Sequence, residues 1–351
     1  FTRVARWLAR FRPQVLHVHT PLAVGLYGML AAKALRYPLV GTNHVYLTRS
    51  NADFLQCINT NHFVLSTLSR LTLAYCTLFY DACTVRISPS SVMIRELGRA
   101  SGRKKFHHLP NGIPQSRIRR LDPRGRPAAR RALGLKDKVV LHFGRLSQEK
   151  NVDAVLRAFA LLAAGRRDVS LLVIGDGPHR AELEVLARTL GIEGVTRFHG
   201  AVPHDELLQS GIVSAADLFV TASATESQGM VIVEAMASGL PVVCVRQAAA
   251  VEAVEDNGIV VPPGDDAAFA EAMASILLHP SLARRMAQRS LEMAERYSVR
   301  ETADRVVELY RGALRGKARP TLSARGVRAL VAFGSKGISL GRRGLRLIRH
   351  G

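Results

Sequence analysis

Cysteine and aromatic residues are scarce in this chain of 351 residues, and it has no long apolar run. No two of its four cysteines have metal-ligand spacing, which favours reduced thiols in the cytosol over a disulfide framework or a zinc site. Aromatic residues make up only 6% of the chain, although hydrophobic residues reach 48%, which is typical of an aliphatic globular core. No apolar stretch has the length of a membrane span, so we expect the chain not to cross a bilayer.

Common catalytic and cofactor motifs are also missing. The sequence contains no P-loop, HExxH or GxSxG motif, no CxxC pair and no Asp-x-Asp metal motif. The turn VIGDGP (173–178) has Arg180 where a dinucleotide fingerprint has its third glycine, which disfavours an NAD-dependent oxidoreductase. The sequence therefore predicts a site without cofactor or metal. We expect this turn to allow close backbone packing near a nucleotide, with a plain tight turn as the alternative.

Acidic residues are the minority charge. The 28 Asp and Glu are outnumbered by 49 Lys and Arg, and the net charge of +21 favours an anionic partner. Residues 99–131 and residues 311–351 each contain eleven Lys or Arg. Nucleic acid is disfavoured as the partner, because aromatic residues do not interleave with the basic runs and no nucleic-acid motif occurs. The candidate partners that remain are an anionic lipid surface and a phosphorylated substrate.

The opening segment FTRVARWLARF predicts a basic amphipathic helix. Its two sides consist of Arg3, Arg6 and Arg10, and of Val4, Trp7, Leu8 and Phe11. Segments of this kind commonly lie on anionic membrane surfaces. The alternative is a solvated helix face, with a disordered basic tail at the other end of the chain.

Strand patterns alternate with helix patterns along most of the chain. We expect strands at 14–19, 38–44, 83–88, 106–110, 138–145, 170–177, 195–200, 217–223, 241–246 and 258–264. Helices are expected between most of them, and three more at 265–315. This alternation predicts an α/β fold with parallel, doubly wound sheets. Ligands of such sheets bind at the carboxyl ends of the strands, and residues 114–131, rich in proline and arginine, form the best linker candidate.

Two glutamates near the end of one predicted strand form the first candidate site. Glu226 lies in a loop that passes through Gly229 into a helix, and Glu234 lies about one turn into that helix. The free N–H groups at a helix N-terminus attract an anion. A ligand lying across the helix start can therefore place one sugar on each carboxylate and a diphosphate between them.

Cations and histidines follow other predicted strands. The segment FGRLSQEKN (143–151) carries Arg145 and Lys150 on one loop, which suits the stabilisation of a diphosphate leaving group. His19 in HVHTP (17–21) ends another strand, and Asn43 and His44 end the next one. For the cations the alternative is a solvated loop, and for the histidines it is a structural role.

The motifs together resemble those of the family 4 glycosyltransferases, which have the GT-B fold. The motifs are HVHTP, ISPSS (87–91), HLPNGIP (108–114), FGRLSQEKN, VIGDGP and TESQGMVIVEAMASGLPVV (225–243). The resemblance implies two Rossmann-like doubly wound domains facing a cleft. It places an acceptor-side domain at 1–118, a nucleotide-sugar domain at 119–300, a helix crossing back at 301–316 and a basic tail at 317–351.

The resemblance also implies an activity and residue roles. It implies a hexosyltransferase (EC 2.4) that moves a hexose from a UDP- or GDP-sugar to an acceptor hydroxyl with retention of configuration. The implied catalytic residues are His19, Arg145, Lys150 and Glu226. The implied donor-binding residues are Gly144, Arg145, Lys150, Gly175, Ser227, Gly229, Met230, Val231 and Glu234, with Glu226 on the donor sugar and Glu234 on the ribose.

The departures from the family pattern concern the first domain. Family members begin with a strand and a Gly-rich loop that this sequence lacks, so we expect an incomplete first βαβ unit and a truncated N-terminus. A non-catalytic remnant that binds nucleotide sugar or membrane is the alternative function. The basic opening helix is similar to that of lipid-directed members, which implies a lipid or other cell-envelope glycoconjugate as acceptor and a peripheral position on the inner face of the cell membrane.

Overall fold

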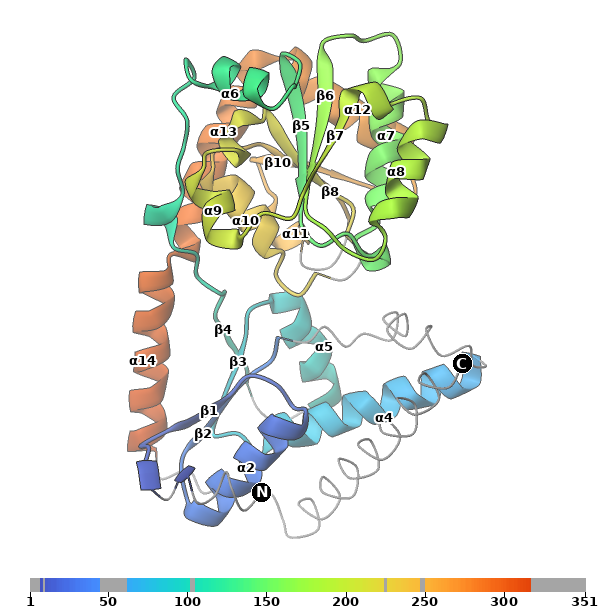
Figure 1. Cartoon of the computed structure of the whole chain (residues 1–351). Helices are drawn as coiled ribbons and strands as arrows, with labels where there is room; N and C mark the ends of the chain where they lie inside the picture. Colours follow the sequence, from blue (N-terminus) through green and yellow to red (C-terminus); the bar gives the residue numbers. More distant parts are fainter. Residues whose placement is uncertain are drawn as a thin grey trace. The chain divides into compact units, whose positions relative to one another are not determined.

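The computed structural model describes residues 7–8, 10–44, 62–101, 105–223, 226–246 and 250–316 (Figure 1). The chain forms two compact units, of which the first comprises Phe1–Pro110 and Ala303–Gly351 and the second Asn111–Thr302. The sequence places the domain boundaries after residues 118 and 300, whereas the two units divide after residues 110 and 302. The assignment of the units to acceptor and donor stays a prediction.

The first unit contains a four-stranded parallel sheet in the order β1-β2-β3-β4. Its strands are β1 (Leu16–Val18), β2 (Leu39–Thr42), β3 (Val85–Ser88) and β4 (His107–His108). The helices are α2 (Ala23–Leu35), α4 (His62–Asp81), α5 (Ser91–Ser101) and α14 (Val299–Arg315), the last of which begins in the second unit. The sequence also predicts a helix at 52–80, and this range lies partly outside the described residues.

Both faces of this sheet are covered because successive strand residues point to opposite sides. Leu39 packs in a cluster with Phe79 and Tyr80 of α4, and the next residue, Val40, packs in a cluster with residues of α14. Parallel sheets need such cover on both faces. The first unit thus forms three layers from segments far apart in the sequence.

The second unit contains a six-stranded parallel sheet in the order β10-β9-β8-β5-β6-β7. Its strands are β5 (Lys138–Phe143), β6 (Val169–Ile174), β7 (Thr196–Gly200), β8 (Leu218–Thr221), β9 (Val242–Val245) and β10 (Gly258–Val261). The chain builds β5, β6 and β7 in one direction and then returns to place β8 beside β5. The strand order therefore reverses between β5 and β8. The predicted fold class, α/β with doubly wound parallel sheets, is confirmed.

Two hydrophobic clusters cover the two faces of this sheet. One cluster includes residues of α7 (Val152–Ala163), α8 (Arg180–Thr189) and α12 (Asp266–Leu278), and the other includes residues of α9 (His204–Gln209) and α10 (Met230–Ala237). The helix α13 (Pro280–Ala294) contributes to both clusters. The remaining helices are α6 (Arg126–Ala132) in the expected linker and α11 (Ala250–Ala253). Both faces carry aliphatic side chains, as the composition predicts.

One helix is shorter than expected. The sequence predicts a helix over 204–215, but α9 ends at Gln209, and Gly211 adopts φ 80 before a short 3-10 turn at Val213–Ala215. Glycine enters this left-handed region readily and so ends the helix. Among the described residues, no helix has the length and apolar character needed to cross a membrane.

A charged pair lies inside the first unit. Arg86 on β3 is 2% exposed, and its Nη1 lies 3.1 Å from Oδ1 of Asp81 at the end of α4. The guanidinium also lies over the ring of Phe106, 5.7 Å from the ring centre. Burial lowers the pKa of Arg86 below its ordinary value, and the charge of Asp81 opposes this shift. The pair thus joins α4 to the sheet at a position where an unpaired charge is costly.

Removing the carboxylate should destabilise the first unit. We expect Asp81→Ala to lower the free energy of unfolding by about 3 kcal/mol, because it leaves the buried Arg86 without its anionic partner. Thermal or urea unfolding followed by circular dichroism measures the effect. The exposed Asp304→Ala is the matched control and should change stability little, and equal stability of the two variants would contradict the expectation.

Candidate functional site

The reversal of strand order places two loops side by side at one edge of the second sheet. The loop after β5 carries Arg145 and Lys150, and the loop after β8 carries Glu226. Because β5 and β8 are neighbouring parallel strands, their carboxyl ends meet at this edge. In open α/β sheets this switch point is where ligands bind. Topology alone thus brings three of the predicted site residues to one place.

Glycines hold the loop after β5 in position. Gly144 and Gly175 follow β5 and β6 with φ values of 148 and 141, which side-chain-bearing residues rarely adopt. A Cβ atom on Gly175 would overlap the carbonyl oxygen of Gly144. The backbone N–H of Gly144 donates to Ile174 O at 3.0 Å, and that of Leu146 donates to Asp176 O at 3.0 Å. The predicted close backbone packing at VIGDGP is confirmed, whereas its nucleotide stays a prediction.

An ion pair joins the two loops. Lys150 ends the short 3-10 helix Gln148–Lys150, and its Nζ lies 2.6 Å from Oε1 of Glu226. The two side chains are 24% and 13% exposed, so solvent reaches the pair only partly. Arg145 on the same loop is exposed and makes no hydrogen bond or ion pair within the described ranges. The site therefore contains one cation held by a carboxylate and one that projects into solvent.

The start of α10 completes this edge of the site. Gly229 adopts φ 72 and ψ 52 directly before the helix, and no side chain caps the N–H groups that follow it. Ser227, Met230 and Val231 are partly buried beside it. The uncapped helix N-terminus presents backbone donors suited to an anion.

Gln228 anchors the same turn and was not predicted. Its Oε1 accepts from the backbone N–H of Asn111 at 2.7 Å, and its Nε2 donates to the carbonyl oxygen of Asn111 at 3.1 Å. The side chain is 6% exposed. Two bonds to one backbone unit thus fix the approach to α10.

Glu234 lies one turn into α10, as predicted, and it is 5% exposed. Its Oε1 lies 2.8 Å from Nε2 of His204, the first residue of α9. Burial raises the pKa of Glu234 above its ordinary value, while the hydrogen bond and the charge of His204 lower it. His204 was not predicted, because a histidine distant in the chain from the glutamates has no recognisable spacing.

A buried histidine behind the ion pair was also missed. His142, on β5, is 2% exposed, and its Nδ1 donates to Val220 O at 2.9 Å. Its pKa is lowered to about 4, chiefly by burial and to a lesser degree by the charge of Lys150, while the hydrogen bond to Val220 and the charge of Glu226 oppose the shift. The imidazole is therefore neutral at pH 7, and its Nε2 has no hydrogen-bond partner among the described residues. A histidine inside a strand pattern resembles a core position, so no sequence signal distinguishes His142 as a site residue.

His19 belongs to the first unit, at the end of β1. Its Nδ1 lies 3.0 Å from Nε2 of His44, and its ring stacks on that of His17 with centroids 4.1 Å apart. Burial lowers the pKa of His19 and of His44, so both rings are neutral at pH 7. Two predicted strand ends are thus brought together. Asn43 instead is buried against the hydroxyl of Tyr80, which is a structural role.

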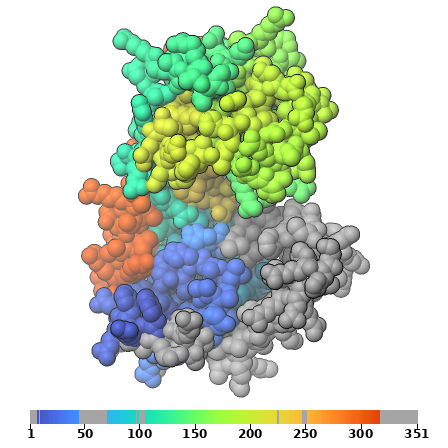
Figure 2. All heavy atoms as spheres, in the orientation of Figure 1, coloured from blue at the N-terminus to red at the C-terminus, as the bar shows by residue number. Residues whose placement is uncertain are grey.

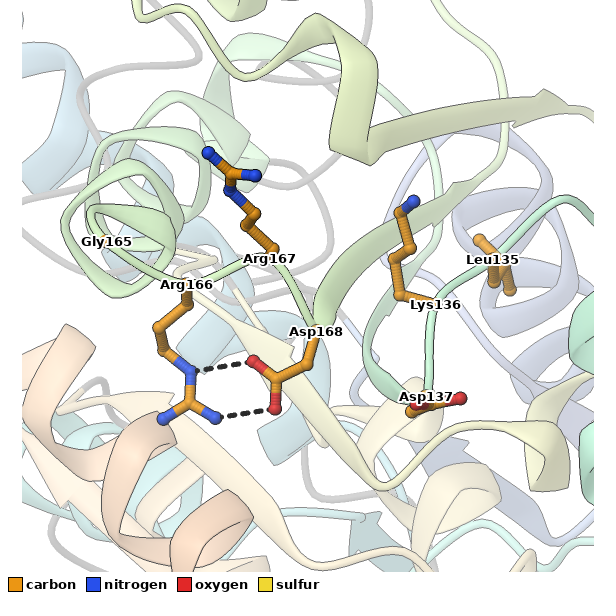
Figure 3. Close-up of a pocket in the computed structure, with 7 residues that line it drawn as sticks. All are labelled: Leu135, Lys136, Asp137, Gly165, Arg166, Arg167 and Asp168. Atoms are coloured by element: carbon orange, nitrogen blue, oxygen red, sulfur yellow. Dashed lines mark hydrogen bonds and ion pairs between the residues drawn. The ribbon is translucent and has the colours of Figure 1, made fainter.

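A separate cavity lies at the opposite end of the second sheet (Figure 3). Its volume is about 630 Å³, and Lys136 and Arg167 line it beside a pair formed by Arg166 and Asp168. These residues precede β5 and β6, whereas ligands of such sheets bind after the strands. The cavity is therefore distinct from the candidate site. Within the described ranges, no group of three or more His, Cys, Asp or Glu is arranged to hold a metal.

Two family models match the chain. The model described as Glycosyltransferase Family 4 matches residues 1–117, and the model described as Glycosyl transferases group 1 matches residues 126–293. The chain belongs to the family 4 glycosyltransferases. The resemblance inferred from the motifs is confirmed.

Individual members of this family match over part of their length. The D-inositol 3-phosphate glycosyltransferase of Saccharomonospora viridis is 37% identical over 212 residues, which cover 56% of this chain and 48% of that protein. The alpha-monoglucosyldiacylglycerol synthase of Streptococcus pneumoniae is 28% identical over 247 residues, covering 69% and 54%. The chain thus spans about half the length of these relatives.

Solved structures support the fold of this family 4 member. The crystal structure of HepE from Anabaena in complex with UDP matches with a TM-score of 0.75 and 24% identity, over 89% of this chain and 81% of that one. The complex of HepE with UDP-glucose matches with a TM-score of 0.74 and 23% identity, over 89% and 81%. At this level of identity the similarity shows the fold alone.

The glycine contact gives a prediction that needs no ligand. We expect Gly175→Ala to destabilise the protein by about 2–4 kcal/mol, because a Cβ atom overlaps Gly144 O and the backbone angle is unfavourable. Thermal unfolding measures the loss. Gly194→Ala is the control, because a Cβ atom there meets nothing within 4 Å. If the two variants melt together, the backbone contact does not constrain the loop.

Proposed function

We propose that this chain transfers a hexose from a UDP- or GDP-sugar to an acceptor hydroxyl with retention of anomeric configuration. The observation that carries the proposal is the Lys150–Glu226 pair at the switch point, 2.6 Å apart. A nucleotide sugar joins a neutral, hydroxyl-rich ring to a diphosphate. A carboxylate beside an ammonium matches that junction, because the carboxylate accepts from sugar hydroxyls and the ammonium binds phosphate.

The other donor contacts follow along the same edge. Arg145 is exposed and unpaired within the described ranges, so its guanidinium is free to bind the diphosphate. The backbone N–H groups that follow Gly229 supply further donors to phosphate oxygens. Glu234, one turn further, accepts from the ribose. The donor thus extends along the start of α10, with its sugar at Glu226 and its nucleoside toward Glu234.

The proposed reaction needs no covalent bond to the protein. As the bond between the anomeric carbon and the phosphate oxygen breaks, negative charge grows on that oxygen, and Lys150 and Arg145 stabilise it. The acceptor oxygen attacks the anomeric carbon on the face from which the phosphate leaves, which retains the configuration. The proton of the acceptor hydroxyl passes to the departing phosphate. A role for His19, which belongs to the first unit, stays a prediction.

Glu226 provides the direct test. We expect Glu226→Gln to reduce kcat/KM by about 10²–10³-fold, because it removes the charge that orients Lys150 and weakens the acceptor for sugar hydroxyls. Turnover is measured with a panel of UDP- and GDP-sugars and a lipid extract as acceptor. Glu149→Gln, on the loop that carries Lys150, is the matched control and should stay active. Full turnover by the Glu226 variant rules out the assigned role.

The acceptor is proposed to be a membrane lipid or another cell-envelope glycoconjugate, reached at the inner face of the cell membrane. One relative is named for D-inositol 3-phosphate and another for the synthesis of monoglucosyldiacylglycerol, so the two relatives differ in the molecules on which they act. The first unit supports a membrane position. Trp7 and Phe11 are 61% and 66% exposed, and their rings stack 4.9 Å apart beside the exposed Arg10 and Arg12.

This arrangement suits an anionic bilayer surface. The dark-blue atoms at the start of the described chain lie on the surface of the molecule (Figure 2). Exposed aromatic rings insert at the level of the headgroups, and each arginine near an anionic surface adds about 1 kcal/mol. The remaining arginines of the predicted opening helix, Arg3 and Arg6, lie outside the described residues.

Liposome binding tests the membrane proposal. We expect the chain to co-sediment with vesicles that contain anionic phospholipid and to be released by salt, because surface charge drives the attraction. The double variant Trp7→Ser, Phe11→Ser should bind at least about tenfold more weakly. Leu161→Ser, at a leucine of the second unit that is 53% exposed, is the control. Equal binding to neutral and anionic vesicles would contradict the proposal.

A further inference from the structure

We propose that His204 is a positioning residue for nucleotide binding, which holds one oxygen of Glu234 so that the other oxygen accepts a ribose hydroxyl. The inference rests on the proposed function, because it takes the ribose to lie on Glu234. It adds a role for His204, which lies outside all of the motifs that carry the family resemblance. The two side chains are 30 positions apart in the sequence and meet only in the folded second unit.

The exposure of the two partners differs sharply. The side chain of Glu234 is 6% exposed, whereas that of His204 is 59% exposed, and the Nε2–Oε1 distance is 2.8 Å. The imidazole is therefore largely in solvent, whereas the carboxylate that it contacts is nearly buried. The second oxygen, Oε2, makes no hydrogen bond within the described ranges. One acceptor of a nearly buried carboxylate is thus occupied by the protein and one is open.

His204 is not needed to attach its own helix. Leu207 and Leu208 of α9 are buried in the hydrophobic cluster, and Leu208 O accepts from the backbone N–H of Arg119 at 2.8 Å. A mainly exposed side chain adds little packing to this anchorage. The bond from His204 therefore acts chiefly on Glu234, whose carboxylate has lost most of its water.

The chemistry explains why such a partner matters. A ribose hydroxyl donates best to an ionised carboxylate, but burial favours the protonated form and raises the pKa of Glu234. Among the described residues, His204 is the titratable group that lowers this pKa. The N–H of the imidazole also fixes the plane of the carboxylate. Removing His204 should leave the glutamate more easily protonated and free to rotate.

Nucleotide titrations test the proposal. UDP and GDP, and the 2′-deoxy and 3′-deoxy form of each, are titrated calorimetrically into the whole chain. For whichever of UDP and GDP binds, we expect His204→Ala to weaken the affinity for the ribonucleotide about tenfold. This is the effect of losing one charge-assisted hydrogen bond. Affinity for the form that lacks the contacted hydroxyl should change little. His204→Gln, which retains an N–H donor, should restore most of the preference for the ribose form over the deoxyribose form.

Further readouts separate positioning from a structural role. His204→Ala should raise the KM for the donor without lowering kcat. As the pH falls, nucleotide affinity should be lost at a higher pH in this variant than in the wild type, because the group that lowers the pKa of Glu234 is gone. His199→Ala, at an exposed histidine of the same unit, is the matched control. Equal losses for ribose and deoxyribose forms, or none, would overturn the proposal.

The failure of the underlying function has a different outcome. If neither UDP nor GDP binds the wild-type chain, or if Glu234→Ala leaves the affinity of the ribose form unchanged, then the assignment of the ribose to Glu234 is wrong. If Glu234→Ala weakens binding and His204→Ala does not, only the role of His204 is wrong. The two proposals can therefore fail separately.

Discussion

The close approach of two backbone turns after β5 and β6 is the constraint on which the site depends. Gly144 and Gly175 meet without side chains, and hydrogen bonds between the two turns hold the loop that carries Lys150. That loop leaves the sheet where the strand order reverses, beside the loop that follows β8. The ammonium therefore reaches Glu226 at 2.6 Å because the backbone permits it. A side chain at Gly175 would overlap the carbonyl oxygen of Gly144, separate the turns and move the cation.

Partial burial then determines how each charged group at this edge behaves. Lys150 and Glu226 neutralise one another, so neither bears the full cost of leaving water. Glu234 is more deeply buried and depends on a single histidine. His142, wholly inside the sheet, is neutral because its burial outweighs the hydrogen bond to Val220 and the charge of Glu226. Such a site presents acceptors and cations in fixed positions, which suits a reaction whose main demand is stabilisation of a leaving phosphate.

Much of this arrangement could be predicted from the sequence. The alternation of strands and helices gave both parallel sheets, and the motif TESQGMVIVEAMASGLPVV gave a loop, a helix start at Gly229 and a glutamate one turn in. These features are local, since φ preferences and periodicity operate over a few residues. The predicted extent of α9 was wrong. The helical pattern continues to residue 215, but the helix ends at Gln209, and Gly211 adopts a left-handed conformation just after it.

What the sequence by itself determined was the fold class, the family and the identity of the charged residues near the strand ends. The tertiary structure alone decided which of them meet. Lys150 contacts Glu226 while Arg145 does not, and His204 contacts Glu234 across 30 positions of chain. Likewise, His17 lies between Thr42 and Tyr310, two residues 268 positions apart. Contacts of this kind depend on the order of strands in a sheet, and a pattern within one segment carries no information about its neighbours in space.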